Sequence, residues 1–205
     1  MLSFEQEIKE YLKSKGIAYF DNSSEFKLLD FTIPDFVVEK SDGKNIGRRL
    51  FLEVKEKRQV YNISNWTLIQ LADEPFTFIV DELSCRKVLA YAPFSGLLIR
   101  DNITNFYYWY SVLDLFLMPK KRVNRPIQKT VAKNLKGKII LDFRNAVKSD
   151  NLEAIIMKVK ESMTNRHHLY TEVNECYGIY HDEIITTQGI TREQSHWDTD
   201  VSETR

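Results

Sequence analysis

Hydrophobic and polar positions follow two different periods along this chain, and the periods predict its elements. Over residues 3–15 the apolar residues recur at helical spacing, with Ser3 suited to cap the start and Gly16 suited to follow the end. Residues 33–39 and 49–55 are β-type runs rich in Phe, Val, Ile and Leu. The polar stretch between them contains Asp, Gly and Asn, which are typical of a turn. We therefore predict a helix followed by a β-hairpin.

The rest of the chain continues with further strand and helix patterns. Residues 76–81 form a nearly continuous apolar run, as expected for an interior strand buried on both faces. The aromatic run at 106–110 is typical of a strand that packs on a core. The spacing also predicts strands at 17–21, 97–100 and 137–143, and helices near 82–91 and 150–163.

The hairpin fixes which charged side chains meet. If its turn is centred near Lys44, Asp35 lies opposite Glu53 with Cβ atoms about 4.5–5.5 Å apart. Strand alternation then puts Glu53 and Lys55 on one face and directs Val54 to the other. Two carboxylates this close require a cation between them. Lys55 is one such cation, and a divalent metal such as Mg²⁺ is another.

The pattern Pro34-Asp35 followed by Glu53-x-Lys55 resembles the PD-(D/E)XK nuclease superfamily. The resemblance covers roughly residues 3–82 and implies the restriction-endonuclease-like fold. That fold is an α/β architecture with a mixed central sheet flanked by helices and a core order of α-β-β-β-α-β. The elements that we assign to this order are the helix at 4–15, the strands at 33–39, 49–55 and 76–81, the helix near 82–91 and the strand at 97–100.

The resemblance also implies roles for the residues of the hairpin. Asp35 and Glu53 would bind Mg²⁺ or Mn²⁺ together with the backbone carbonyl of Val54. Lys55 would orient the attacking water and stabilise the transition state. The alternative interpretation is a surface hairpin with an ordinary cross-strand ion pair.

A glutamate on the first helix often reaches the metal site in this superfamily. Glu5 matches that position best and is a candidate catalytic and metal-binding residue, with Glu7 as the second choice. Either glutamate is equally well explained as a favourable acid in the first turn of a helix.

A basic segment spans residues 119–141, which contain eight Lys and Arg residues and no Asp or Glu. Pro126 suits the first position of a helix, and helical spacing after it places an apolar face opposite a lysine face. An unopposed basic stripe is suited to contact phosphates, although a solvated lysine face without a partner remains an alternative. The residues that we assign to nucleic-acid binding are Arg122, Arg125, Lys129, Lys133 and Lys136.

The composition bounds the organisation of the 205 residues. We expect one nuclease-like domain over residues 1–185, with a core at about 3–101, a basic extension at about 102–165 and a flexible tail at 186–205. The 29 basic and 29 acidic residues balance, so the net charge does not indicate a partner. The two separated cysteines, with no signal peptide and no apolar run of membrane length, predict a cytoplasmic protein that binds no membrane.

These observations together predict a function. The leading hypothesis is a divalent-metal-dependent endonuclease that hydrolyses phosphodiester bonds in DNA, acting as a homodimer or within a larger complex. The competing hypotheses are a catalytically inert nucleic-acid-binding protein with the same fold, and a subunit of a restriction or mobile-element complex.

Overall fold

The computed structural model describes residues 2–22, 33–39, 49–61, 74–118, 120–126, 135–164, 178–180, 183–186 and 189–192. Its main element is a six-stranded sheet in the order β1-β2-β3-β5-β6-β9. Strands β3 and β5 run parallel and every other neighbouring pair is antiparallel, so the sheet is mixed. The six strands are β1 (Tyr19–Asp21), β2 (Phe36–Glu39), β3 (Arg49–Lys57), β5 (Ser95–Asp101), β6 (Phe106–Ser111) and β9 (Val147–Ser149).

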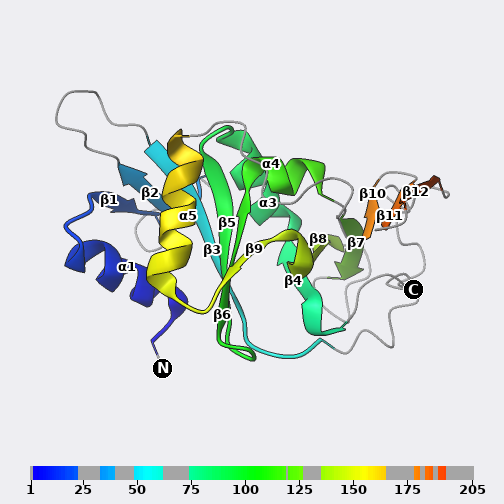
Figure 1. Cartoon of the computed structure of the whole chain (residues 1–205), viewed down its shortest axis with the longest axis horizontal. Coiled ribbons are helices and arrows are strands. Elements are labelled where there is room, and N and C mark those ends of the chain that lie inside the picture. Colours follow the sequence, from blue (N-terminus) through cyan, green and yellow to red (C-terminus); the bar gives the residue numbers. More distant parts are fainter. Residues whose placement is uncertain are drawn as a thin grey trace.

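Helices cover both faces of this sheet, and a second sheet lies beside it (Figure 1). The described α-helices are α1 (Phe4–Ser14), α3 (Glu82–Ala90), α4 (Val112–Leu117) and α5 (Leu152–Thr164). Two short 3₁₀ helices are η1 (Glu74–Phe76) and η2 (Phe143–Asn145). The second sheet, in the order β4-β8-β7, contains β4 (Thr77–Asp81), β8 (Leu135–Asp142) and β7 (Lys121–Pro126). A third sheet contains β10 (Gly178–Tyr180), β11 (Glu183–Thr186) and β12 (Gly189–Arg192).

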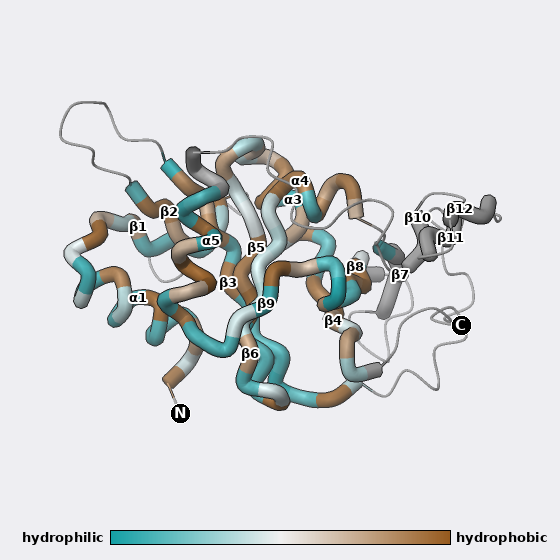
Figure 2. Tube along the Cα trace, viewed as in Figure 1, coloured by the Kyte–Doolittle hydropathy of each residue, from teal (hydrophilic) through white to brown (hydrophobic). Residues whose placement is uncertain are grey.

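The two faces of the main sheet carry separate hydrophobic cores. Side chains of α1 and α5, such as Ile8 and Ile155, pack on one face together with Leu52 and Val54. Residues of α3, α4 and the second sheet pack on the other face. Figure 2 shows hydrophilic residues gathered where β3 and β5 end, at the lower edge of the sheet in that view.

Most of the predicted elements are confirmed, and so is the hairpin register. Phe36 pairs with Leu52 and Glu39 pairs with Arg49, which is the register that brings Asp35 towards Glu53. The helices predicted near 82–91 and 150–163 correspond to α3 and α5. The Asn151 side chain caps the start of α5 by accepting hydrogen bonds from the Glu153 and Ala154 amides.

The α/β fold with a mixed sheet is as expected, but a different strand completes its core. The predicted order puts the 76–81 strand in the central sheet, whereas β4 pairs with β8 in the second sheet. The predicted 17–21 strand, which is β1, instead pairs with β2. β4 is an edge strand of the second sheet and not an interior strand buried on both faces: Phe78 and Val80 pack in the second core, whereas Ile79 is partly exposed. Hydrophobicity alone does not distinguish the two positions.

The helix predicted from Pro126 through Lys136 is wrong at both ends. Pro126 is the last residue of β7 and pairs with Leu135, the first residue of β8. A helix over this stretch would separate these two residues by about 13 Å, whereas directly paired strand residues lie about 5 Å apart. Residues 127–134, which join the two strands, lie outside the described part of the chain.

The predicted tail begins at residue 186, but part of it is a strand. Residues 189–192 form β12, which pairs with β11. Residues 193–205 lie outside the described part of the chain. Among the described residues, the helices are all too short or too polar to cross a bilayer.

Candidate active site at the end of strand β3

Strand β3 divides its side chains between the two faces of the sheet. Leu52 and Val54 point into the core beneath α1 and α5. Glu53 and Lys55 alternate with them and therefore face the opposite side. The strand is central in the sheet, with β2 on one side and β5 on the other, so its backbone is held firmly from both edges.

Asp35 reaches β3 from the residues that precede β2. Asn22, which follows β1, fixes the backbone of Pro34 and Asp35. Its amide donates to the Asp35 carbonyl at 2.9 Å, and its side chain donates to the Pro34 carbonyl at 3.2 Å. The Asp35 Oδ2 atom accepts hydrogen bonds from the Val54 amide at 2.8 Å and from the Lys55 ammonium at 3.2 Å. The structure therefore brings Asp35 to Glu53 and Lys55, as the register predicts.

The Lys55 ammonium lies where three oxygen atoms converge. It is 2.7 Å from Glu53 Oε1 and 3.2 Å from Asp35 Oδ2, and it donates to the Val54 carbonyl at 2.9 Å. Burial alone would lower the pKa of Lys55, but the nearby Glu53 and Asp35 carboxylates outweigh it and raise the pKa above its usual value. Lys55 is therefore a firmly charged cation at this point.

Glu53 is more deeply buried than its partners. Its side chain is 1% exposed, compared with 13% for Asp35 and 30% for Lys55. Its Oε2 atom has no hydrogen-bond partner among the described residues, and the Lys87 ammonium of α3 is 3.6 Å away. A buried carboxylate oxygen in this condition is costly unless a cation compensates it.

Lys87 is a residue of this site that the sequence pattern does not reveal. It lies on α3, which also buries Ser84, Cys85 and Val88. Nothing in the local pattern separates Lys87 from an ordinary surface lysine, because its contact with Glu53 spans the α3 crossover between parallel strands. The neighbouring Cys85 has its pKa raised to about 12 by burial, which makes thiolate chemistry at this site unfavourable.

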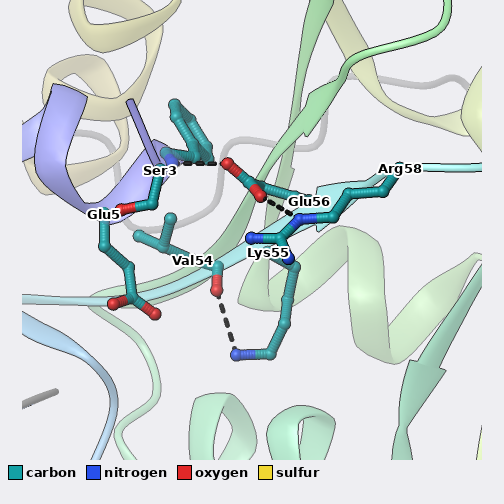
Figure 3. Close-up of a pocket in the computed structure, with 7 residues that line it drawn as sticks. Ser3, Glu5, Val54, Lys55, Glu56 and Arg58 are labelled. Carbon is teal, nitrogen blue, oxygen red and sulfur yellow. Dashed lines mark hydrogen bonds and ion pairs between the residues drawn. The ribbon is translucent and has the colours of Figure 1, made fainter. Parts of the chain in front are cut away.

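A pocket of about 330 Å³ opens between the start of α1 and the end of β3. Figure 3 shows the Glu5 side chain, the Val54 carbonyl and the Lys55 ammonium directed towards the same space. The residues that line the pocket are Ser3, Phe4, Glu5, Val54, Lys55, Glu56 and Arg58.

Glu7, the second choice from the sequence, has a different environment. Its carboxylate forms an ion pair with Arg100 and accepts a hydrogen bond from the Tyr107 hydroxyl at 2.5 Å. Burial, together with this contact, raises the pKa of Tyr107 to about 12. Arg100 also binds Glu56 at 2.6 Å, and Glu56 accepts a hydrogen bond from the Phe4 amide. The structure thus places Glu5 in the pocket and Glu7 in a network that holds α1 on the sheet.

The proposed nucleic-acid-binding residues are only partly described. Arg122 and Arg125 lie in β7 and Lys136 lies in β8, where Lys136 pairs with Arg125 and Arg122 pairs with Ile139. Lys129 and Lys133 fall within residues 127–134, outside the described part of the chain.

The oxygens around the Lys55 ammonium fit a small divalent cation. In the described part of the chain, no three His, Cys, Asp or Glu side chains are grouped as a metal site. The convergent atoms come instead from two carboxylates and one backbone carbonyl. Mg²⁺ commonly takes one or two carboxylates and completes its shell with water and phosphate oxygens. The Glu53 Oε2 atom has no hydrogen bond in the described part of the chain and is a further oxygen that could bind a metal, with the Lys87 ammonium 3.6 Å away.

Comparison of the sequence with protein-family models and with curated proteins gives no match. Among solved structures, the chain is similar to Hjc, a Holliday junction resolvase from the archaeal hyperthermophile Archaeoglobus fulgidus. The TM-score is 0.40 at 13% identity, covering 76% of this chain and 98% of the resolvase. It is also similar to D212, a nuclease from a fusselovirus, with a TM-score of 0.41 at 8% identity, covering 78% of this chain and 87% of that one.

Both structural neighbours have TM-scores below 0.5, so they carry no argument about the family of this chain or the roles of its residues. The function of the chain is therefore inferred from the geometry of its own site.

Replacing Arg100 by Met is expected to loosen α1 and, with it, the pocket. The change leaves the carboxylates of Glu7 and Glu56 without their shared cation in a partly buried place. We expect the free energy of unfolding to fall by about 3 kcal/mol, measured by urea denaturation, and the α1 amides to exchange faster with solvent.

The matched control is Lys15→Met. Lys15 joins α1 to α5 through Glu153, but the two side chains are 44% and 56% exposed. Its loss should leave stability nearly unchanged. An Arg100→Met variant as stable as this control would contradict the assigned role of the network.

Proposed function

We propose that this chain is a divalent-metal-dependent endonuclease that hydrolyses phosphodiester bonds in DNA. The observation that supports it most directly is the convergence of Asp35, Glu53 and the Val54 carbonyl on one cation position. This position lies beside a pocket that also contains a further carboxylate, Glu5, and a further cation, Arg58. Acidic oxygens that gather a cation next to a space for phosphate are what hydrolysis of a phosphodiester requires.

Each residue of the site would have a separate role in hydrolysis. Asp35, Glu53 and the Val54 carbonyl would hold Mg²⁺ or Mn²⁺, which supplies a water of lowered pKa and neutralises charge on the phosphate. Lys55 would hold the attacking water and stabilise negative charge on the phosphate oxygens. Glu5 would accept a hydrogen bond from a water in the pocket or bind a second ion.

The duplex would be held outside this pocket. We assign backbone contacts to Arg122, Arg125, Lys129, Lys133 and Lys136, since contacts of this kind position DNA without reading its sequence. A homodimer or a larger complex would allow both strands to be cut.

Cleavage of supercoiled plasmid tests the proposed active site. With Mg²⁺ or Mn²⁺ the wild type should nick the plasmid, and EDTA should abolish the nicking. Asp35→Ala and Lys55→Ala should reduce the rate by roughly 10²–10³-fold or more while DNA binding is retained. The Asp35→Asn side chain can still accept a hydrogen bond from the Val54 amide, so this variant distinguishes the effect of losing the negative charge from the effect of losing the local structure.

Glu39→Gln is the matched control for these variants. Glu39 lies on β2, the strand that follows Asp35, but it pairs with Arg49 at the far end of the hairpin. Its cleavage rate should equal that of the wild type. A wild type that binds DNA and never cuts it would instead favour the inert nucleic-acid-binding protein.

Glu5 and Glu7 are expected to fail in different ways when each is replaced by Gln. Glu5→Gln should lower the cleavage rate without loss of stability, because Glu5 lines the pocket. Glu7→Gln should lower the melting temperature, because Glu7 pairs with Arg100 and Tyr107. Cleavage assays and thermal denaturation of both variants would check this. If Glu5→Gln lost as much stability as Glu7→Gln, the assignment of Glu5 to the site would be wrong.

The salt dependence of DNA binding tests the basic residues. Replacing Arg122, Arg125, Lys129, Lys133 and Lys136 together by Ala should weaken binding. If all five contact phosphates, the slope of log K against log salt should become shallower by about 4 to 5.

The control removes the same amount of charge from outside the second sheet. It replaces five exposed lysines on α1, its C-cap, β9 and α5, which are Lys13, Lys15, Lys148, Lys158 and Lys160. Its salt slope should stay close to that of the wild type. Equal slopes for the two variants would mean that net charge, and not the basic segment, governs binding.

A further inference from the structure

The place of the Lys55 ammonium bears on how the site binds a metal. Its three oxygen neighbours are Glu53 Oε1, Asp35 Oδ2 and the Val54 carbonyl, at 2.7, 3.2 and 2.9 Å. These are the groups that the proposed function assigns to the divalent ion. The Lys55 ammonium therefore occupies the position that the proposed function assigns to the divalent ion.

The two cations compete for these oxygens. Asp35 Oδ2 already accepts hydrogen bonds from the Val54 amide and from the Lys55 ammonium, so both of its lone pairs are in use while the ammonium stays. Mg²⁺ approaches its oxygens more closely than an ammonium does, at about 2.0–2.1 Å. Two positive charges side by side in a partly buried site also repel strongly. Binding of the metal at these three oxygens thus requires the ammonium to move.

We propose that Lys55 is the internal cation of this site, and that a divalent metal binds by displacing its ammonium into the adjacent pocket. This inference rests on the proposed function, because it takes the metal ligands from there. It adds an order of events: the lysine neutralises Asp35 and Glu53 first, and it becomes available to a substrate phosphate only once the metal has replaced it.

The surroundings of Lys55 allow this movement. Its side chain is 30% exposed and lines the pocket, so the ammonium can leave without crossing the core. Glu5 lines the same pocket and is directed towards the same space, so it offers the displaced ammonium a carboxylate partner (Figure 3).

Lys87 provides an internal comparison, because it contacts the same glutamate from another direction. Its ammonium is 3.6 Å from Glu53 Oε2, and its side chain is 18% exposed on α3. Lys55 bridges both carboxylates and the carbonyl, whereas the Lys87 ion pair involves Glu53 alone. Lys87 can therefore stay in place and balance the charge of Glu53 while Lys55 moves.

Displacement of the ammonium links the binding of DNA to the binding of metal. A phosphate in the pocket gives the displaced ammonium a new anionic partner, so bound DNA favours the displaced arrangement and hence the metal. By linkage, metal must favour DNA to the same extent. Part of this mutual reinforcement should disappear when Lys55 is replaced.

The test is direct binding of Mn²⁺ in the absence of DNA, followed by electron paramagnetic resonance or calorimetry. Lys55→Met keeps an unbranched side chain that is one heavy atom shorter, and it removes the charge. We expect it to bind Mn²⁺ about tenfold more tightly than the wild type, as the loss of a competing ion pair implies. Lys87→Met removes a charge 3.6 Å from Glu53 Oε2 but does not vacate the three oxygens around Lys55, so it should change the affinity by less than about threefold.

Two outcomes of this binding experiment would overturn the proposal. In one, Lys55→Met binds Mn²⁺ no more tightly than the wild type, so the lysine does not compete. In the other, Lys87→Met gains as much affinity as Lys55→Met, so the gain reflects general charge and not displacement.

Stability and structure give independent readouts. Without metal, Lys55→Met should melt below the wild type, because its two carboxylates face each other without their cation, and Mn²⁺ should restore it. A crystal structure of the wild type with Mn²⁺ should show the Lys55 ammonium away from Asp35 and Glu53. An ammonium that keeps both contacts beside a bound metal would refute displacement.

These results separate the present inference from the proposed function. If the wild type cleaves DNA with Mg²⁺ but Lys55→Met gains no affinity for Mn²⁺, displacement is wrong and the nuclease function stands. If the wild type neither binds Mn²⁺ nor cleaves DNA, both are wrong.

Discussion

The structure depends on how strand β3 compensates the charges that it carries into the interior. Four charged residues of this strand lie close to Val54 in the sequence: Glu53, Lys55, Glu56 and Lys57. Each of them needs a partner of opposite charge, since an unpaired buried charge costs several kcal/mol. The pairs are Glu53 with Lys55 and Lys87, Glu56 with Arg100, and Lys57 with Asp101. Lys57 is 2% exposed, donates to the Pro75 carbonyl in η1 and lies over the Phe143 ring in η2, so it connects β3 to the two 3₁₀ helices that adjoin β4 and β8.

This compensation explains why a site on one strand involves so much of the molecule. On one face of the sheet, Lys55 forms an ion pair with Asp35 at the start of the hairpin, and Glu53 forms one with Lys87 of α3. On the other, Glu56 binds Arg100 and the Phe4 amide, which fixes the start of α1 and with it the position of Glu5. Burial would raise the pKa of Glu56, but its bonds to Arg58 and Phe4 and the charge of Arg100 hold that pKa below its usual value. The proposed chemistry and the docking of α1 therefore share one strand.

The features that the sequence predicts correctly are those determined locally. The hairpin register follows from one turn and from strand alternation, so the sequence alone suffices to bring Asp35, Glu53 and Lys55 together. It does not suffice to place β4, because apolar residues such as Phe78 and Val80, each 2% exposed in the second sheet, are equally typical of a strand in the central sheet. The lysine spacing after Pro126 fits a helix, yet Pro126 pairs with Leu135 through contacts that local spacing does not encode. The contact of Lys87 with Glu53 is equally hidden, because it depends on how α3 crosses the sheet.

The parallel pairing of β3 with β5 has a consequence for folding. At the ends of these strands Glu56 lies beside Arg100 and Lys57 beside Asp101, so each step of the ladder joins opposite charges, with the signs reversed between the two faces. A slip of one residue that put Glu56 beside Asp101 would also put Lys55 beside Arg100. Both steps would then join like charges, and every apolar side chain of β5 would turn to the wrong face. The charges at this end of β3 and β5 therefore favour the native register over a slip of one residue.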